Sequence, residues 1–183
     1  QEVVTSGEEL VKSRRTLAPR LSAIVRLAYR RVAGASEELR ATYKPSAEGD
    51  LAVAIAQSRA RERALRSTLF GPHRDDLVLL LDEKPAAAFA SEGQKRTIAI
   101  ALKVAQAEYM TGRTGSPPLL LIDDVMGELD SRRRSGLVPL FEQSRKAGGQ
   151  VFLTCTEESW SRELGLQMTR WHVQAGHLSR ADS

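Results

Sequence analysis

The sequence predicts an α/β fold in which a largely parallel sheet with flanking helices follows an amino-terminal helical arm. From residue 69 onward, continuously apolar runs such as residues 77–81 and 119–122 alternate with helical patterns, which is typical of parallel strands buried on both faces. Before that point, two helical patterns carry stripes of arginine. We therefore expect two domains, a helical arm at residues 1–68 and a lobe at residues 69–183.

Composition limits the class of protein. The chain has 183 residues, of which 42% are hydrophobic and 27% are charged, enough to bury one core with an appendage. The single cysteine, Cys155, cannot form an internal disulfide or a cysteine-based zinc site and suits a reducing, cytoplasmic location. No apolar stretch approaches the roughly 20 residues of a membrane span. The chain begins at Gln1 and not at methionine, as a piece of a longer protein would.

In the arm, helical periodicity over residues 7–33 predicts a helix that Pro19 breaks or kinks. A short strand at Leu39–Lys44 and a second helix at residues 51–66 follow. In the lobe we expect a strand at 77–81, a helix after Ser91, a loop at 111–118, a strand ending at 123, a helix at 131–146, a strand at 150–156, a short helix, and a last pair of strands around 170–178.

Positive charge is concentrated in the arm. Of the net charge of +4, residues 1–68 contribute 13 Lys and Arg against 8 Asp and Glu, whereas the remainder is close to neutral. The excess suggests an anionic partner, with nucleic acid the first choice, although a solvated helix face is the better explanation of the charge taken alone. The residues concerned lie at helical spacing: Arg26, Arg30, Arg59, Arg63 and Arg66.

A pair of acids ends the strand at residues 119–122. In a parallel sheet ligands bind at the carboxyl ends of the strands, which is where Asp123 and Asp124 fall. There Asp123 would hold Mg²⁺, as the strand-end aspartate of nucleotide hydrolases does, and Asp124 would orient an attacking water. The alternative is a buried strand whose terminal acids cap the next helix.

A second motif, Ser91-Glu92-Gly93-Gln94, opens a helix. Free backbone N–H groups at a helix start bind anions, and a glycine there lets the backbone approach a phosphate. An ordinary capped helix is the alternative. Further along the chain, GELD at residues 127–130 follows the acids, and a strand ending in Thr154-Cys155-Thr156 follows about 30 residues later.

The order FGPHRDDL, FASEGQKRT, LLLIDDVMGELD and QVFLTCTE resembles the carboxy-terminal half of the RecF family, within the ABC-type P-loop ATPase heads of SMC-like proteins. The resemblance is good from about residue 69 to 177. It implies that residues 69–183 are the signature/Walker B lobe of such a head. Because no GxxxxGK[ST] loop is present, it also implies that the Walker A half is missing.

The resemblance further implies roles for individual residues. Two copies would close around two ATP molecules, with the signature residues acting on the nucleotide of the other copy. Asp123 would hold Mg²⁺, Asp124 would be the catalytic base, and Asp130 of the D-loop would communicate across the dimer. The switch residue would be Thr154 or Thr156, a choice that stays open. The signature residues are Ser91, Gly93 and Gln94.

The function implied is slow, DNA-stimulated ATP hydrolysis by a dimer of the full-length protein. The dimer would bind duplex DNA near single-strand gaps and help to load recombinase there. This half alone would be inactive. RecR, RecO and RecA would be the protein partners. Arg74 is a further expected DNA contact, although it and His73 could instead be structural. The alternatives are a non-catalytic DNA-binding or dimerisation module, or another SMC-like head. A receiver domain is excluded because its acid pair would come earlier in the chain.

Overall fold

A computed structural model of the chain describes residues 2–34, 36–124, 129–156 and 168–181. The elements follow one another in this order: α1 (Glu2–Ala33), β1 (Leu39–Lys44), α2 (Leu51–Leu65), the 3₁₀ turn η1 (Pro72–Arg74), β2 (Asp76–Leu81), β3 (Lys84–Pro85), α3 (Ala86–Phe89), α4 (Glu92–Thr114), β4 (Leu120–Ile122), α5 (Ser131–Lys146), β5 (Val151–Leu153), β6 (Trp171–Gln174) and β7 (His177–Arg180).

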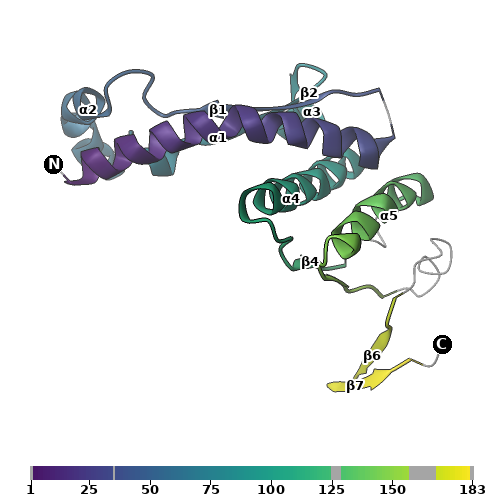
Figure 1. Cartoon of the computed structure of the whole chain (residues 1–183). Helices are drawn as coiled ribbons and strands as arrows, with labels where there is room; N and C mark the ends of the chain where they lie inside the picture. The colour runs from purple at the N-terminus through teal and green to yellow at the C-terminus, as the bar shows by residue number, and fades with distance from the viewer. Residues whose placement is uncertain (1, 35, 125–128, 157–167, 182–183) are drawn as a thin grey trace.

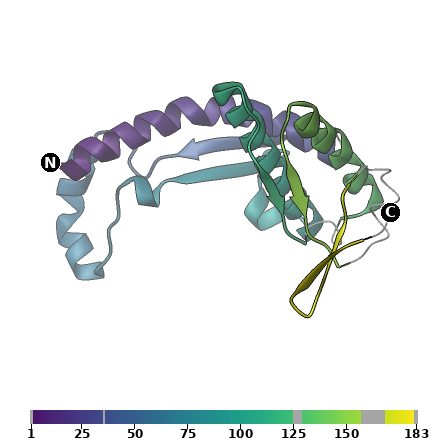
Figure 2. The same cartoon turned by 60° about the horizontal axis from the view of Figure 1, so that its bottom comes forward.

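Helix α1 packs against elements of both the arm and the lobe. It lies against α2 near its amino-terminal end and against α4 and α5 near its carboxyl end (Figures 1 and 2). A break at Pro19 is wrong, because α1 runs without interruption from Glu2 to Ala33, while a kink there stays a prediction. Pro19 is exposed, so the carbonyl that loses its N–H partner can bond to water, while the neighbouring Ala18 is buried against the rest of the fold.

The strand predicted at residues 39–44 is confirmed, and it pairs antiparallel with β2 in the register Leu39↔Leu81 to Lys44↔Asp76. A tight turn at Asp82 and Glu83, both with positive φ (48° and 62°), leads into β3. The β1–β2 pairing and the contact between α1 and α4 cross the expected boundary after residue 68, so arm and lobe share a sheet and a core. The division into two domains stays a prediction.

The lobe is α/β, as predicted, and β4 and β5 form a parallel pair. The expectation that the strand at residues 77–81 is parallel is wrong, because β2 pairs antiparallel with both β1 and β3. Helix α5 has the predicted bounds, and the hairpin β6–β7 is the predicted last strand pair. Helix α4 is longer than expected, so the loop begins at Gly115 (φ 74°) instead of residue 111. Hydroxyl groups of Thr111 and Thr114 bond to carbonyls one turn back and support this last turn. The short helix expected before the hairpin falls on residues 157–167, which lie outside the described residues.

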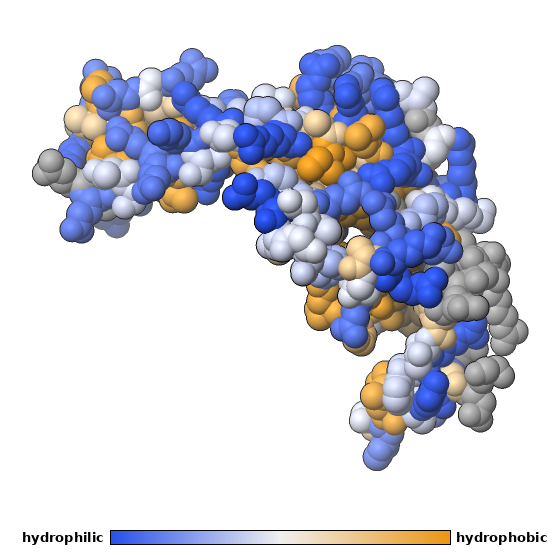
Figure 3. Space-filling view, viewed as in Figure 1, coloured by the Kyte–Doolittle hydropathy of each residue, from blue (hydrophilic) through white to orange (hydrophobic). Residues whose placement is uncertain are grey.

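The two faces of the β4–β5 pair differ in burial. Ile122 and Leu153 pack against the core, whereas Leu121 and Phe152 on the other face are 72% and 56% exposed. The expectation that the strands are covered on both faces is therefore wrong for the described residues. Figure 3 shows apolar side chains gathered on the surface in this part of the lobe. Among the described residues, no helix has both the length and the apolar character needed to cross a membrane.

Helices α1 and α5 cross closely at Gly136. A Cβ placed there would lie 2.7 Å from the carbonyl oxygen of Arg31 and 2.8 Å from that of Val32. Both contacts are to backbone, which cannot rotate away as a side chain can. The crossing thus needs a residue without a side chain at this point of α5.

Gly136→Ala is expected to lower the free energy of unfolding by about 1–3 kcal/mol, because the added methyl group overpacks the crossing. Gly112→Ala is the matched control. Gly112 also lies within a helix, but a Cβ there meets nothing within 4 Å. That change is expected to stabilise the protein by about 0.4–1 kcal/mol. Urea denaturation followed by circular dichroism measures both, and equal effects of the two substitutions would contradict the close crossing.

Candidate nucleotide and Mg²⁺ site

The acid pair and the switch strand meet at the carboxyl ends of β4 and β5. The backbone N–H of Asp124 donates to the carbonyl oxygen of Thr154 (3.2 Å) and to its hydroxyl oxygen (2.9 Å). The same hydroxyl donates a short hydrogen bond to Oδ1 of Asp123. Thr154 therefore ties together the two residues that the sequence predicts for Mg²⁺ and for catalysis. Thr156 lies two residues beyond this group and is exposed.

Backbone strain accompanies this arrangement. Asp124 has φ 47°, in the left-handed region that non-glycine residues seldom adopt, although Asp and Asn tolerate it best. Both carboxylates are exposed, so they are open to a ligand from solvent.

The oxygen atoms at this edge fit Mg²⁺ carried by a nucleotide. Mg²⁺ typically uses one or two carboxylates and takes its remaining ligands from phosphate and water. Asp123 provides one such carboxylate at the end of β4, and it is exposed to solvent. It is therefore placed to share a cation with phosphate oxygens and water.

Ser91 caps α4, as predicted. Its hydroxyl oxygen accepts from the N–H of Gln94 (3.2 Å), and its own N–H donates to Oε1 of Gln94 (2.7 Å), which completes a capping box. The amide nitrogen of Gln94 donates to Glu37 (2.7 Å). Both ends of the Gln94 amide are thus used within the chain. The remaining N–H groups of the first turn point toward the start of the helix.

Glu37 links this helix start to α1. Its second carboxylate oxygen accepts from the hydroxyl of Tyr29 (2.7 Å), a fully buried side chain. Burial, together with the hydrogen bond to Glu37, raises the pKa of Tyr29 far above its ordinary value. No sequence signal predicts this link, because Glu37 stands in a short segment without a periodic pattern.

Asp130 lies at the start of α5 and close to the signature. Its carboxylate caps the helix by accepting from the N–H of Arg133 (2.8 Å), and it also accepts from the guanidinium of Arg133 (2.5 Å). That guanidinium reaches Gly93, so the D-loop residue and the signature glycine are separated by one side chain. Residues 127 and 128 of the GELD motif lie outside the described residues. The run Arg132-Arg133-Arg134 was the available sequence signal for this contact.

The predicted DNA-binding arginines form two separate groups. Those of α2 (Arg59, Arg63 and Arg66) are exposed near the amino-terminal end of α1, where Leu51 meets Gly7. Arg26 and Arg30 lie near the carboxyl end of α1. At 1.5 Å per residue, about 35 Å of helix separates Arg30 from the Gly7 contact. DNA binding by these residues stays a prediction, and it would require a ligand that spans the arm or touches one end only.

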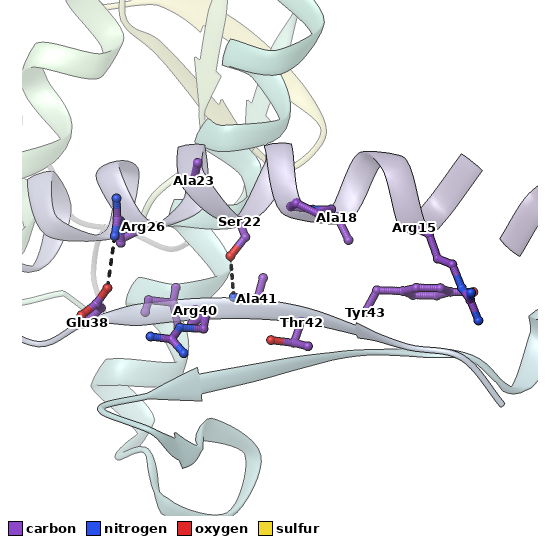
Figure 4. Close-up of a pocket in the computed structure, with 12 residues that line it drawn as sticks. Arg15, Ala18, Ser22, Ala23, Arg26, Glu38, Arg40, Ala41, Thr42 and Tyr43 are labelled. Atoms are coloured by element: carbon purple, nitrogen blue, oxygen red, sulfur yellow. Dashed lines mark hydrogen bonds and ion pairs between the residues drawn. The ribbon is translucent and has the colours of Figure 1, made fainter. Parts of the chain in front are cut away.

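A groove of about 520 Å³ lies between α1 and β1, with arginines on its rim (Figure 4). Arg26 pairs with Glu38 at 3.3 Å, and Arg40 pairs with Glu83 at 3.0 Å. An incoming phosphate would have to displace these carboxylates. The groove therefore offers less free positive charge than its arginines suggest.

The GPHRDD segment holds the entrance to β2 in place. Arg74 donates to the carbonyl of Thr68 (2.9 Å) and to the hydroxyl of Ser67 (2.5 Å), and His73 bonds to the hydroxyl of Thr68 (2.6 Å). These bonds support the structural alternative for both residues. DNA contact by Arg74 stays a prediction.

Sequence reasoning did not single out Asp75, the most buried acid of this segment, with a side chain only 2% exposed. Its carboxylate accepts from Arg14 (3.0 Å), from the N–H of Ser46 (2.8 Å) and, through a short bond, from Tyr43. Burial by itself raises the pKa of Asp75, but the hydrogen bonds from Tyr43, Ser46 and Arg14 outweigh it and leave this pKa below its ordinary value. Asp75 thus ties α1, β1 and β2 together.

Comparison with known proteins agrees with the geometry. No protein-family model matches the chain. The DNA replication and repair protein RecF of Lactobacillus delbrueckii subsp. bulgaricus is 35% identical over 192 residues, covering 97% of this chain and 49% of that protein. The chain spans about half the length of the curated relatives it matches.

Solved structures give the same result at the level of the fold. A structure of the recombination mediator protein RecF with ATP matches with a TM-score of 0.76 at 26% identity, covering 99% of this chain and 48% of that one. A structure described for ATP-driven dimerization and DNA stimulated activation of SMC ATPases matches with a TM-score of 0.56 at 14% identity, covering 94% and 88%. The chain belongs to the RecF family of DNA replication and repair proteins, with the fold of an SMC-type ATPase head, and it fits the carboxy-terminal half of its relatives.

Proposed function

We propose that the chain is the signature and Walker B half of an ATP-dependent DNA-binding protein of recombinational gap repair. The observation that carries the proposal is the hydroxyl of Thr154, which joins Asp123 to the backbone of Asp124 at the ends of two parallel strands. A strand-end acid pair held by the residue that follows the neighbouring strand is the arrangement that a P-loop ATPase needs on its Walker B side.

In the proposed reaction, Asp123 holds Mg²⁺, and Asp124 orients the attacking water and accepts its proton. Thr154 is the better placed of the two switch threonines, because its hydroxyl already contacts the acid pair. A γ-phosphate that bonds to this hydroxyl would change the position of both acids together. Bound ATP with Mg²⁺ supplies the phosphate that is transferred to water and part of the charge that stabilises the transition state.

The signature side would act on the nucleotide of a second copy. Ser91 and the N–H groups of the first turn of α4 present hydrogen-bond donors and the positive end of the helix dipole to an anion. Gly93 has no side chain that would stand between the helix start and a phosphate. Gln94 contributes by fixing Ser91, since its amide is already engaged within the chain. The active site would be complete only after dimerisation, which makes hydrolysis slow.

The Walker A loop would come from the part of the protein that relatives have beyond this half, and this half alone would be inactive. The open face of β4–β5, with Leu121 and Phe152, suits contact with that part. The dimer would bind duplex DNA near single-strand gaps, mainly through phosphate contacts, and would act with RecR, RecO and RecA in the cytoplasm.

Ser91→Arg tests the proposal in a full-length protein that contains this chain. The bulky cation is expected to block ATP-dependent dimers while the monomer still binds ATP, because the signature contacts the nucleotide only across the dimer. Light scattering measures dimerisation, and fluorescent-nucleotide titration measures ATP binding. Ser116→Arg, at the opposite end of α4, is the control and should dimerise normally. ATP-dependent dimers of the Ser91 variant would refute the signature role, and dimers of the wild type that ignore ATP would support a non-catalytic module.

A further inference from the structure

Arg133 occupies an unusual position between two segments of the proposed site. It is the third residue of α5, and its guanidinium is bonded to Asp130 at 2.5 Å. Its side chain is 27% exposed, and its Nε is buried without an acceptor among the described residues. A buried donor without a partner is rare in a folded protein and calls for an explanation.

The same guanidinium lies over the signature turn. A Cβ on Gly93 would be 3.4 Å from one terminal nitrogen of Arg133 and 3.8 Å from its central carbon. The guanidinium is thus within contact distance of the turn at Gly93. Through this one group, the start of α5 is packed against the start of α4, about 40 residues earlier in the sequence.

Stability does not account for the arrangement. A partly exposed ion pair within the first turn of a helix contributes little to stability. A buried donor without an acceptor costs at least as much as such a pair contributes. The free energy gained from the contact with Asp130 is therefore no larger than the free energy lost by leaving Nε unpaired. What the guanidinium does provide is a fixed spacing between the D-loop and the signature.

We propose that Arg133 is a positioning residue that holds Asp130 and the turn at Gly93 together, so that both segments meet the second copy as one unit. This inference rests on the proposed function, because it assumes that both segments face the dimer. The guanidinium is suited to the role, since it bonds to Asp130 and also lies within van der Waals distance of the position that a Cβ on Gly93 would take.

The test uses Arg133→Ala and Arg133→Lys in the full-length protein. Arg133→Ala is expected to raise the ATP concentration for half-maximal dimerisation about tenfold, the equivalent of a coupling of about 1.4 kcal/mol. ATP affinity of the monomer should not change. Lysine keeps the charge but has no guanidinium to contact Asp130 and the turn at Gly93 together, so Arg133→Lys should not restore the dimerisation, and both variants should keep the thermal stability of wild type. Arg145→Ala, an exposed arginine in the last turn of the same helix, is the control and should behave as wild type.

A double-mutant cycle with Asp130→Asn separates positioning from a purely local role. If Arg133 acts through Asp130, the double variant should dimerise no worse than the weaker single variant. Additive effects, full rescue by lysine, or normal dimerisation of Arg133→Ala would each overturn the inference. Failure of the wild type to dimerise with ATP would instead overturn the proposed function. If the wild type dimerises with ATP, Ser91→Arg does not and Arg133→Ala does so normally, this inference is refuted and the proposed function stands.

Discussion

Asp124→Asn in the full-length protein is expected to lower the rate of ATP hydrolysis by about 10²–10⁴-fold, the usual contribution of a general base. ATP-dependent dimers should still form. The substitution is well suited to the question because Asn tolerates the left-handed backbone (φ 47°) nearly as well as Asp. The two bonds from residue 124 to Thr154 use its backbone N–H and remain in place. The change therefore removes the negative charge and preserves the local structure.

Steady-state hydrolysis with and without duplex DNA, together with light scattering at saturating ATP, measures the effect. Asp82→Asn is the matched control, since Asp82 has φ 48° and lies in the β2–β3 turn away from the acid pair. Its turnover should equal that of wild type. Asp123→Asn should differ from Asp124→Asn, because it should weaken the dependence of the hydrolysis rate on the Mg²⁺ concentration. Unchanged turnover in Asp124→Asn would refute its role as the base.

Asp75→Ala is expected to lower the free energy of unfolding by about 3 kcal/mol, the lower end of the range for breaking a buried ion pair. The substitution leaves the hydroxyl of Tyr43 and the N–H of Ser46 without their acceptor. Arg14 is 41% exposed and can turn toward water, which limits the loss. Urea denaturation measures it. Asp76→Ala, which removes the exposed neighbouring acid, should change stability by less than about 0.5 kcal/mol.

The contribution of Asp75 should also depend on pH in a defined direction. Because its pKa is below the ordinary value in the folded protein, the contribution is fully present above about pH 4, the value for an unfolded Asp. It is lost as the pH falls through the lowered pKa. The stability difference between wild type and Asp75→Ala should therefore shrink between pH 4 and pH 2. A difference that stays constant to pH 2 would show that the charge of Asp75 is not what stabilises the fold.

The local elements of this protein could be predicted from its sequence. The bounds of α5, the cap at Ser91 and the strand at residues 39–44 all follow from short-range signals: apolar periodicity, a capping serine with glutamine three residues later, and β-branched or aromatic runs. The order of the motifs was sufficient to indicate the family. Each of these signals depends only on residues a few positions apart, so a short stretch of the sequence is enough to recognise it.

The tertiary structure alone decided which distant residues meet. Thr154 and Thr156 are alike in sequence, and only the register of β5 against β4 brings the first of them to the acid pair. The contact of Arg133 with Gly93 likewise depends on how two segments far apart in the chain pack. So does the continuation of α1 through Pro19, where burial of the adjacent turn outweighs one lost hydrogen bond. The sequence by itself determined the elements and the family, whereas the spacing within the site came from packing between segments that no local pattern connects.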